Sequence, residues 1–170
     1  MVRFLTAVMA AVSLFTTAVP RLHATSRASN TNESVRLAPQ ERRLVNAVNA
    51  YRDERGLPSL SVDPVLMRIA RHAAPCFSHV VDGKWCWHRA RQAGFRGWAT
   101  DNIANGYPTP EEAVDGWATS HGHAMQMRGC FKMNGRWCNY KFNRLGVGVC
   151  GRKYIAVFGR DDSRPPAKRS

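Results

Sequence analysis

The residue types best suited to chemistry gather in one part of the chain, between Asp101 and His123. This segment holds a carboxylate at Asp101, a hydroxyl at Ser120 and imidazoles at His121 and His123. A carboxylate, a hydroxyl and an imidazole are the parts of a hydrolase triad. The sequence lacks the other marks of that chemistry, since Ser120 is not in a Gly-x-Ser-x-Gly turn and no pair of oxyanion-hole donors is evident. The segment is therefore the predicted site, and the triad is a disfavoured interpretation of it.

A helix start lies directly before the serine and the histidines. The Thr109 hydroxyl can cap the amide of Glu112, while the Glu112 carboxylate can reach back toward Thr109. This pattern predicts a helix from Thr109 to about Ser120, with Trp117 anchoring it in the core.

The segment that carries Asp101 has a different composition. Residues 95–106 contain several Gly and Asn residues and are expected to be irregular, with Asn102 hydrogen-bonded to backbone. Residues two apart on a helix point in different directions, so only one of His121 and His123 can face the site unless the helix has ended. Gly122 makes such an ending plausible.

Apolar periodicity predicts further elements around this segment. Helices first and a hairpin last are typical of an α+β domain. The expected elements are a helix at 39–55, a helix from the N-cap Asp63 and Pro64 to about Pro75, a short helix at 88–93, and strands at 144–149 and 153–158.

The N-terminus has the features of an export signal. Residues 4–15 form an uncharged apolar run behind Arg3, and this run is too short to span a bilayer. We predict a signal peptide at 1–24, a disordered linker at 25–38, one ordered domain at 39–160 and a disordered tail at 161–170. An uncleaved N-terminal anchor is the alternative. In either case the domain faces an oxidising space, and the protein is expected to be secreted or periplasmic.

The chain is strongly basic, with a formal net charge of +13. In an exported protein this surplus suggests attraction to an anionic envelope polymer, a membrane surface or a lipid head group. A solvated basic surface without a partner is the alternative, because the arginines are scattered. No nucleic-acid-binding motif accompanies them, so nucleic acid is not an expected partner. The sequence carries no signal for an oligomeric state.

The spacing of the cysteines favours two local disulfides, Cys76–Cys86 and Cys130–Cys138, each closing a loop that contains Trp and a Gly turn. A loop of this size would stabilise the fold by about 2.5–3 kcal/mol in the chain-entropy model. Cys150 is left over, and its apolar, strand-like surroundings predict a buried, inert thiol. Metal binding by the cysteines is disfavoured, because no Cys-x-x-Cys pair occurs.

Taken in order, these motifs resemble the CAP superfamily of cysteine-rich secretory, antigen 5 and pathogenesis-related 1 proteins, in its bacterial SCP-like form. The resemblance covers roughly residues 40–160 and implies a three-layer α-β-α sandwich with a central antiparallel sheet and a surface cleft. The motifs that show the resemblance are Asn-Ala-Tyr-Arg at 49–52, Phe-Ser-His at 77–79, Asp-Asn-Ile-Ala at 101–104, Trp-Ala-Thr-Ser-His-Gly-His at 117–123 and Leu-Gly-Val-Gly-Val at 145–149.

The resemblance also implies which residues line the cleft. Animal and plant members carry two histidines and two glutamates that can hold a divalent metal, and the matching positions here are His79, Asp101, Ser120 and His123. Asp101 keeps the charge of the first glutamate on a shorter side chain. Ser120 replaces the second glutamate by a hydroxyl, which is a poor zinc ligand. His121 stands where relatives often carry proline and is expected to point outward, and an insertion at 128–139 could rim the cleft.

Two interpretations of this set stay open. His79, Asp101 and His123 could form a weak, exchangeable zinc site with water completing the shell. Alternatively, Asp101 accepts hydrogen bonds from an imidazole and from Ser120 in a polar network that needs no metal. The predicted cleft residues are His79, Asp101, Asn102, Ser120 and His123.

Three classes of function fit the sequence. The favoured one is a binding or interaction module for a lipid, a glycan or an envelope component, without catalytic turnover. The alternative is a metal-dependent hydrolase acting on envelope peptide or glycan, but it lacks a general base because Ser120 stands where a second carboxylate would be needed. The third is a structural, disulfide-stabilised surface protein.

Overall fold

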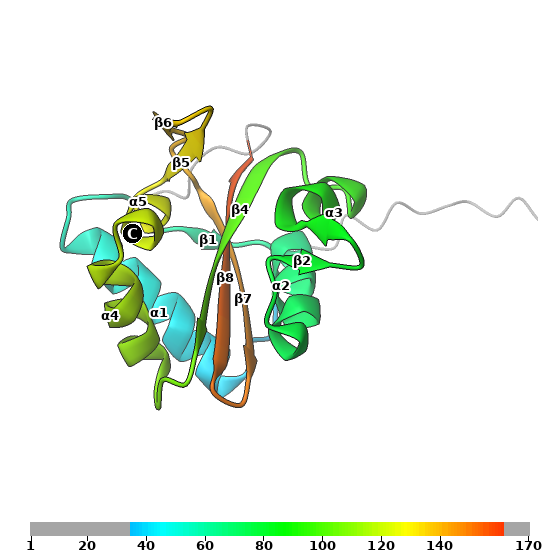
Figure 1. The fold of residues 1–170 in the computed structure, drawn as a ribbon. Helices are drawn as coiled ribbons and strands as arrows, with labels where there is room; N and C mark the ends of the chain where they lie inside the picture. The colour runs from blue at the N-terminus through cyan, green and yellow to red at the C-terminus, as the bar shows by residue number, and fades with distance from the viewer. Residues whose placement is uncertain (1–34, 162–170) are drawn as a thin grey trace, which may run out of the picture. The chain divides into compact units, whose positions relative to one another are not determined.

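The computed structural model describes residues 35–161 (Figure 1). The predicted signal peptide at 1–24, linker residues 25–34 and tail residues 162–170 lie outside the described residues. No helix within 35–161 combines the length and the apolar character needed to cross a membrane. In chain order the elements are α1 (Pro39–Asp53), β1 (Ser61–Val62), α2 (Pro64–Cys76), β2 (Val80–Val81), β3 (Lys84–Trp85), α3 (Cys86–Gln92), β4 (Gly97–Asn105), α4 (Pro110–Thr119), α5 (His121–Met127), β5 (Cys130–Met133), β6 (Arg136–Asn139), β7 (Arg144–Cys150) and β8 (Lys153–Asp161).

A four-stranded sheet with the order β1-β7-β8-β4 forms the middle layer. The three long strands β7, β8 and β4 are antiparallel, whereas β1 adds two residues parallel to β7. The predicted antiparallel sheet is therefore confirmed for the long strands. The prediction did not include β1, because a two-residue strand has no periodic pattern in the sequence.

The side chains of β8 alternate between two cores, as a strand buried on both faces requires. Tyr154, Ala156 and Phe158 pack with α1 and α4, whereas Ile155 and Val157 pack with α2 and α3. Figure 1 shows the two pairs of helices on opposite sides of the sheet. The predicted three-layer α-β-α sandwich is confirmed.

Both helix starts expected from capping patterns are present. The Asp63 side chain accepts hydrogen bonds from the amides of Val65 and Leu66 at the start of α2. The Thr109 hydroxyl accepts from the amide of Glu112 at 3.2 Å and donates to the Glu112 carboxylate at 3.0 Å. Each pattern satisfies backbone donors that the first helical turn leaves without intrahelical partners.

Four expectations about local structure were wrong or shifted. The segment at 95–106 is not irregular, because β4 pairs with β8 along its whole length and this pairing outweighs the loop-like composition. The third helix begins at Cys86 rather than at residue 88, since it follows directly on β3. Cys150 is exposed rather than buried, because it lies at the end of β7 beside the turn at Gly151. Strand β8 also extends to Asp161, the first residue of the predicted tail.

Helix α2 lies directly against the backbone of β7. A Cβ atom on Gly146 would overlap the backbone of Leu66, and one on Gly148 would overlap the backbone of Ala70. Glycine is therefore required at both positions for the close approach of helix and strand. This contact fixes the depth at which α2 sits on the sheet.

We expect Gly146→Ala to destabilise the domain by more than about 2 kcal/mol, because a new methyl group must displace the α2 backbone rather than a side chain. Gly122→Ala is the matched control, since a Cβ there meets nothing within 4 Å, and its effect should stay within about 1 kcal/mol. Urea unfolding followed by circular dichroism measures both. Equal effects of the two substitutions would contradict the proposed contact.

Candidate functional site

Asp101 reaches the site from β4, the strand at one edge of the sheet. It pairs with Val157 of β8 and shares its face of β4 with Ala99 and Ile103, which pack on the α2 and α3 side. The residue is only 6% exposed. A carboxylate this buried needs a hydrogen-bonding partner to offset the loss of water.

His79 supplies that partner from the turn after α2. The helix ends where Phe77 adopts a left-handed conformation with φ of 45°. Two residues later, His79 Nδ1 lies 3.1 Å from Asp101 Oδ2. This hydrogen bond raises the pKa of His79, against the opposing effect of burial. The structure thus brings together two residues that are far apart in the sequence and were both predicted for the site.

The serine and the second histidine come from the junction of α4 and α5. Ser120 is extended between the two helices, with φ of −93° and ψ of 116°. His123 is half-buried and its Nδ1 lies 2.9 Å from Ser120 Oγ. His121 is exposed, with its ring 5.5 Å from that of Trp137. The break at Ser120 therefore directs His123, and not His121, toward the site.

His123 and Asn102 tie α5 to β4. Burial lowers the pKa of His123, and the charge of His79 lowers it further, whereas Asp101 acts in the opposite direction. The Asp101 charge thus acts on both imidazoles. Asn102 is fully buried and donates from Nδ2 to the His123 carbonyl at 3.1 Å. As expected it bonds backbone, although that backbone belongs to α5 rather than to its own segment.

The pairing of these groups does not form a hydrolase triad. A triad needs the hydroxyl and the carboxylate on one imidazole, whose two nitrogens they share. Here Ser120 bonds to His123, whereas Asp101 bonds to His79. The hydroxyl and the carboxylate are thus bonded to different imidazole rings.

The same pairing bears on the predicted zinc site at His79, Asp101 and His123. Within residues 35–161, no three His, Cys, Asp or Glu side chains are placed so that they could hold a metal ion. As the side chains lie, the only carboxylate of the set is engaged by His79. This arrangement does not fit a three-ligand zinc shell, and the zinc site stays a prediction.

A cleft of about 580 Å³ opens beside Asp101 and His79. The predicted cleft set contains only these two of its lining residues. The others come from separate elements, and the high tryptophan count was a partial signal for them. They are Trp85, Cys86, Trp87, His88, Ala99, Thr100, Gln126 and Phe131.

The predicted insertion at 128–139 contributes to this cleft. It forms the hairpin of β5 and β6, in which Phe131 pairs with Cys138. Phe131 lines the cleft, so the insertion does border it. Ser120, Asn102 and His123 are not among the lining residues of this cleft.

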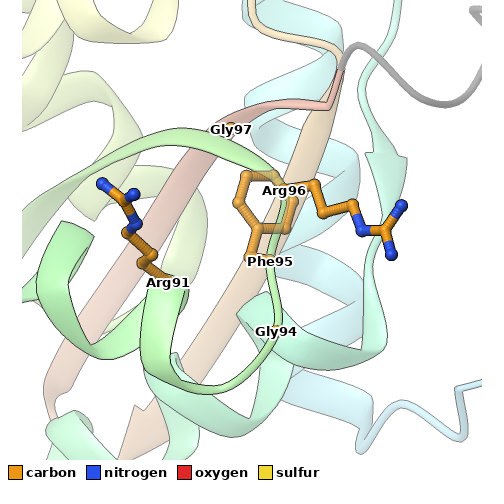
Figure 2. Close-up of a pocket in the computed structure, with 5 residues that line it drawn as sticks. All are labelled: Arg91, Gly94, Phe95, Arg96 and Gly97. Atoms are coloured by element: carbon orange, nitrogen blue, oxygen red, sulfur yellow. The ribbon is translucent and has the colours of Figure 1, made fainter.

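A second concavity, of about 600 Å³, lies at the turn between α3 and β4 and contains none of the predicted site residues. Figure 2 shows its lining, in which the side chains of Arg91 and Arg96 extend in opposite directions on either side of Phe95. The two guanidinium groups do not converge on one point. This concavity therefore lacks the convergent polar groups of a ligand site.

The five cysteines are free thiols in the structure. Cys76 is exposed at the end of α2, whereas Cys86 is buried, and burial raises the pKa of the Cys86 thiol. Cys130 and Cys138 lie on the paired strands β5 and β6. The disulfides Cys76–Cys86 and Cys130–Cys138 are not formed here, and both pairings stay predictions.

Comparison with known proteins relates this arrangement to one family. The cysteine-rich secretory protein family, CAP, matches residues 45–151. The uncharacterized protein YkwD of Bacillus subtilis (strain 168) is 28% identical over an alignment of 140 residues that covers 74% of this chain and 49% of that protein. The chain thus spans about half the length of this relative.

Two solved structures share the fold. An extracellular protein containing an SCP domain from Bacillus anthracis str. Ames superimposes with a TM-score of 0.58 and 25% identity, over 75% of this chain and 45% of that chain. An outer surface protein from Borrelia burgdorferi gives a TM-score of 0.60 with 16% identity, over 75% of this chain and 97% of that chain.

The His79–Asp101 hydrogen bond predicts a specific pH dependence. Because the folded state raises the pKa of His79, its contribution to stability is fully present below the unfolded pKa of about 6.5 and is lost as pH rises through the folded pKa. His123 has a lowered pKa, so its contribution is present above that unfolded value and is lost as pH falls through the folded pKa.

We expect Asp101→Asn to lower the pKa of His79 toward its ordinary value, as measured by NMR titration of the imidazole resonances. The stability difference between wild type and variant should be larger below about pH 6 than above about pH 8. The His72 resonances serve as internal reference, since His72 bonds to Asp82 and not to Asp101. An unchanged His79 titration in the variant would show that Asp101 is not its partner.

Proposed function

Since this chain belongs to the cysteine-rich secretory protein (CAP) family, we propose that it is an exported binding module whose cleft beside β4 holds a lipid, a glycan or another envelope component without turning it over. Membership of the family supports the fold, and the lining of the cleft supports a binding function.

Export is supported from two sides. The first residues have the composition of a signal peptide, with an uncharged apolar run at 4–15. Two relatives of the same fold are named as an extracellular protein and an outer surface protein. We therefore propose that the domain acts outside the cytoplasm, where its net charge of +13 favours contact with anionic envelope polymers or lipid head groups.

The observation that carries the proposal is the lining of the cleft. Its volume of about 580 Å³ lies in the range of sites for small molecules. Aromatic rings at Trp85, Trp87 and Phe131 alternate with polar groups such as Thr100 and Gln126. Such a mixture of apolar surface and a few polar groups is typical of binding sites.

The chemistry around the cleft supports binding more than turnover. A general base must be free to take a proton from a reacting group. His79 engages one oxygen of the Asp101 carboxylate, Oδ2, and the Ser120 hydroxyl is hydrogen-bonded to His123. Among residues 35–161, no second carboxylate joins these pairs in a cluster that could hold a metal ion, and Ser120 stands at the position where the family resemblance implies one.

We expect the purified domain to sediment with isolated envelope fragments, and to do so at high salt as well as at low salt. Salt screens adsorption of the basic surface, so the part that survives about 0.5 M salt reports on the cleft. Trp85→Ala should reduce that part, because Trp85 lines the cleft and is 53% exposed. Binding that vanishes at high salt, or that Trp85→Ala leaves intact, would contradict a role for the cleft.

One observation favours a second candidate function, a metal-dependent hydrolase of envelope peptide or glycan. In both His79 and His123 the Nδ1 atom is hydrogen-bonded within the site. Metal-binding imidazoles are usually oriented in this way, so that Nε2 can bind the ion. The single carboxylate argues against the hydrolase, because it attracts a cation only modestly and the basic surface opposes a cation.

Calorimetric titration of zinc into the chelator-stripped domain separates the two candidates. If the domain only binds its ligand, we expect no saturable heat at sub-millimolar zinc. Saturable heat that His123→Ala abolishes would favour the hydrolase and contradict the proposed binding module. The His121→Ala variant is the matched control, since His121 is exposed and faces Trp137.

A further inference from the structure

The cleft has an aromatic wall assembled from different elements. Trp87 of α3 stacks on Trp98 of β4, with ring centroids 5.3 Å apart and planes 20° apart. Trp98 in turn contacts Phe131 of β5 at 5.4 Å. Trp87 and Phe131 line the cleft, whereas Trp98, which contacts both, is not among the lining residues. The packed rings form a rigid apolar surface rather than three independent side chains.

Trp85 stands apart from this wall at the mouth of the cleft. Trp85 is 53% exposed, and its ring centroid lies 6.5 Å from that of His79 with the planes 26° apart. Covering the exposed ring with a ligand would remove apolar surface from water. Trp85 is thus a platform next to the His79–Asp101 pair.

Polar groups with unused hydrogen-bonding capacity lie beside these rings. Thr100 Oγ1 donates to Gln126 Oε1 at 3.3 Å, and the Gln126 side chain makes no other hydrogen bond within residues 35–161. The amide NH₂ of Gln126 is therefore available as a donor. Asp101 accepts from His79 through Oδ2, which leaves Oδ1 available as an acceptor in the described part of the chain.

These groups discriminate between the ligand classes. An acyl chain would cover the aromatic surface but would strip water from Asp101 and Gln126 without replacing it, at a cost of about 1–3 kcal/mol for each neutral group and more for the carboxylate. A sugar offers hydroxyls that both donate and accept, and its C–H face can pack on a ring. The Asp101 carboxylate also disfavours an anionic ligand.

We infer that the cleft binds an uncharged saccharide, with Trp85 as the stacking platform and with Asp101 and Gln126 as hydrogen-bonding partners. The inference rests on the proposed function and names the class of ligand for the same cleft. The sugar ring lies against Trp85, and its hydroxyls donate to Asp101 and accept from Gln126.

Calorimetric titration of the domain with a neutral tetrasaccharide of N-acetylglucosamine tests this assignment. We expect saturable binding with a sub-millimolar Kd. Trp85→Ala should weaken it by about tenfold or more, and Gln126→Ala should weaken it measurably while the fold is retained. Trp137→Ala is the matched control, because Trp137 packs on His121 and does not line the cleft.

The same titration with laurate gives the competing outcome. Laurate binding that depends on Trp85, without tetrasaccharide binding, would overturn the saccharide assignment in favour of a lipid. Equal losses in Trp85→Ala and Trp137→Ala would also overturn it. A domain that sediments with envelope fragments but ignores the tetrasaccharide would refute this inference alone, whereas a domain that does neither would refute the proposed function as well.

Discussion

The contact of α2 with the bare backbone of β7 sets the geometry on which the site depends. Gly146 and Gly148 let the helix approach until its backbone at Leu66 and Ala70 leaves no room for a Cβ. The turn that follows α2 carries His79, so the depth of the helix decides how far His79 stands from β4. Continuous antiparallel pairing joins β7 to β8 and β8 to β4. The position of α2 on β7 therefore also fixes the position of His79 relative to Asp101 of β4, at 3.1 Å.

The second constraint is that β4 lies at the edge of the sheet, where unsatisfied backbone groups invite aggregation. Side chains cover part of this edge, because Trp117 Nε1 donates to the Ile103 carbonyl at 3.0 Å and Asn102 holds the first turn of α5. Ala99, Thr100 and Asp101 remain beside the cleft instead. The cleft is thus the stretch of the sheet edge that α4 and α5 leave uncovered, which explains why polar and aromatic groups from both faces meet there.

The features that could be predicted from the sequence are those determined by local interactions. The capping side chains of Asp63 and Thr109 act within one helical turn, so both helix starts could be foreseen. Strand β4 was missed because its Asp and Asn residues are typical of loops, and only pairing with a distant strand makes them extended. His79 was identified through family resemblance, since no local signal links it to Asp101. The packing of the aromatic wall could not be predicted, because α3, β4 and β5 are brought together only by the tertiary fold.

The charge balance of the site follows from which residues share it. Asp101 raises the pKa of His79, while burial and the charged His79 lower that of His123. Over the pH range between these two pKa values, the set holds one positive imidazole, one carboxylate and one neutral imidazole, so that its net charge is close to zero. A second carboxylate at position 120 would make the site negative and attractive to a cation. With a hydroxyl there instead, His123 has a neutral partner, and the Asp101 charge is paired with His79. Such a site favours an uncharged, hydrogen-bonding ligand over an ion.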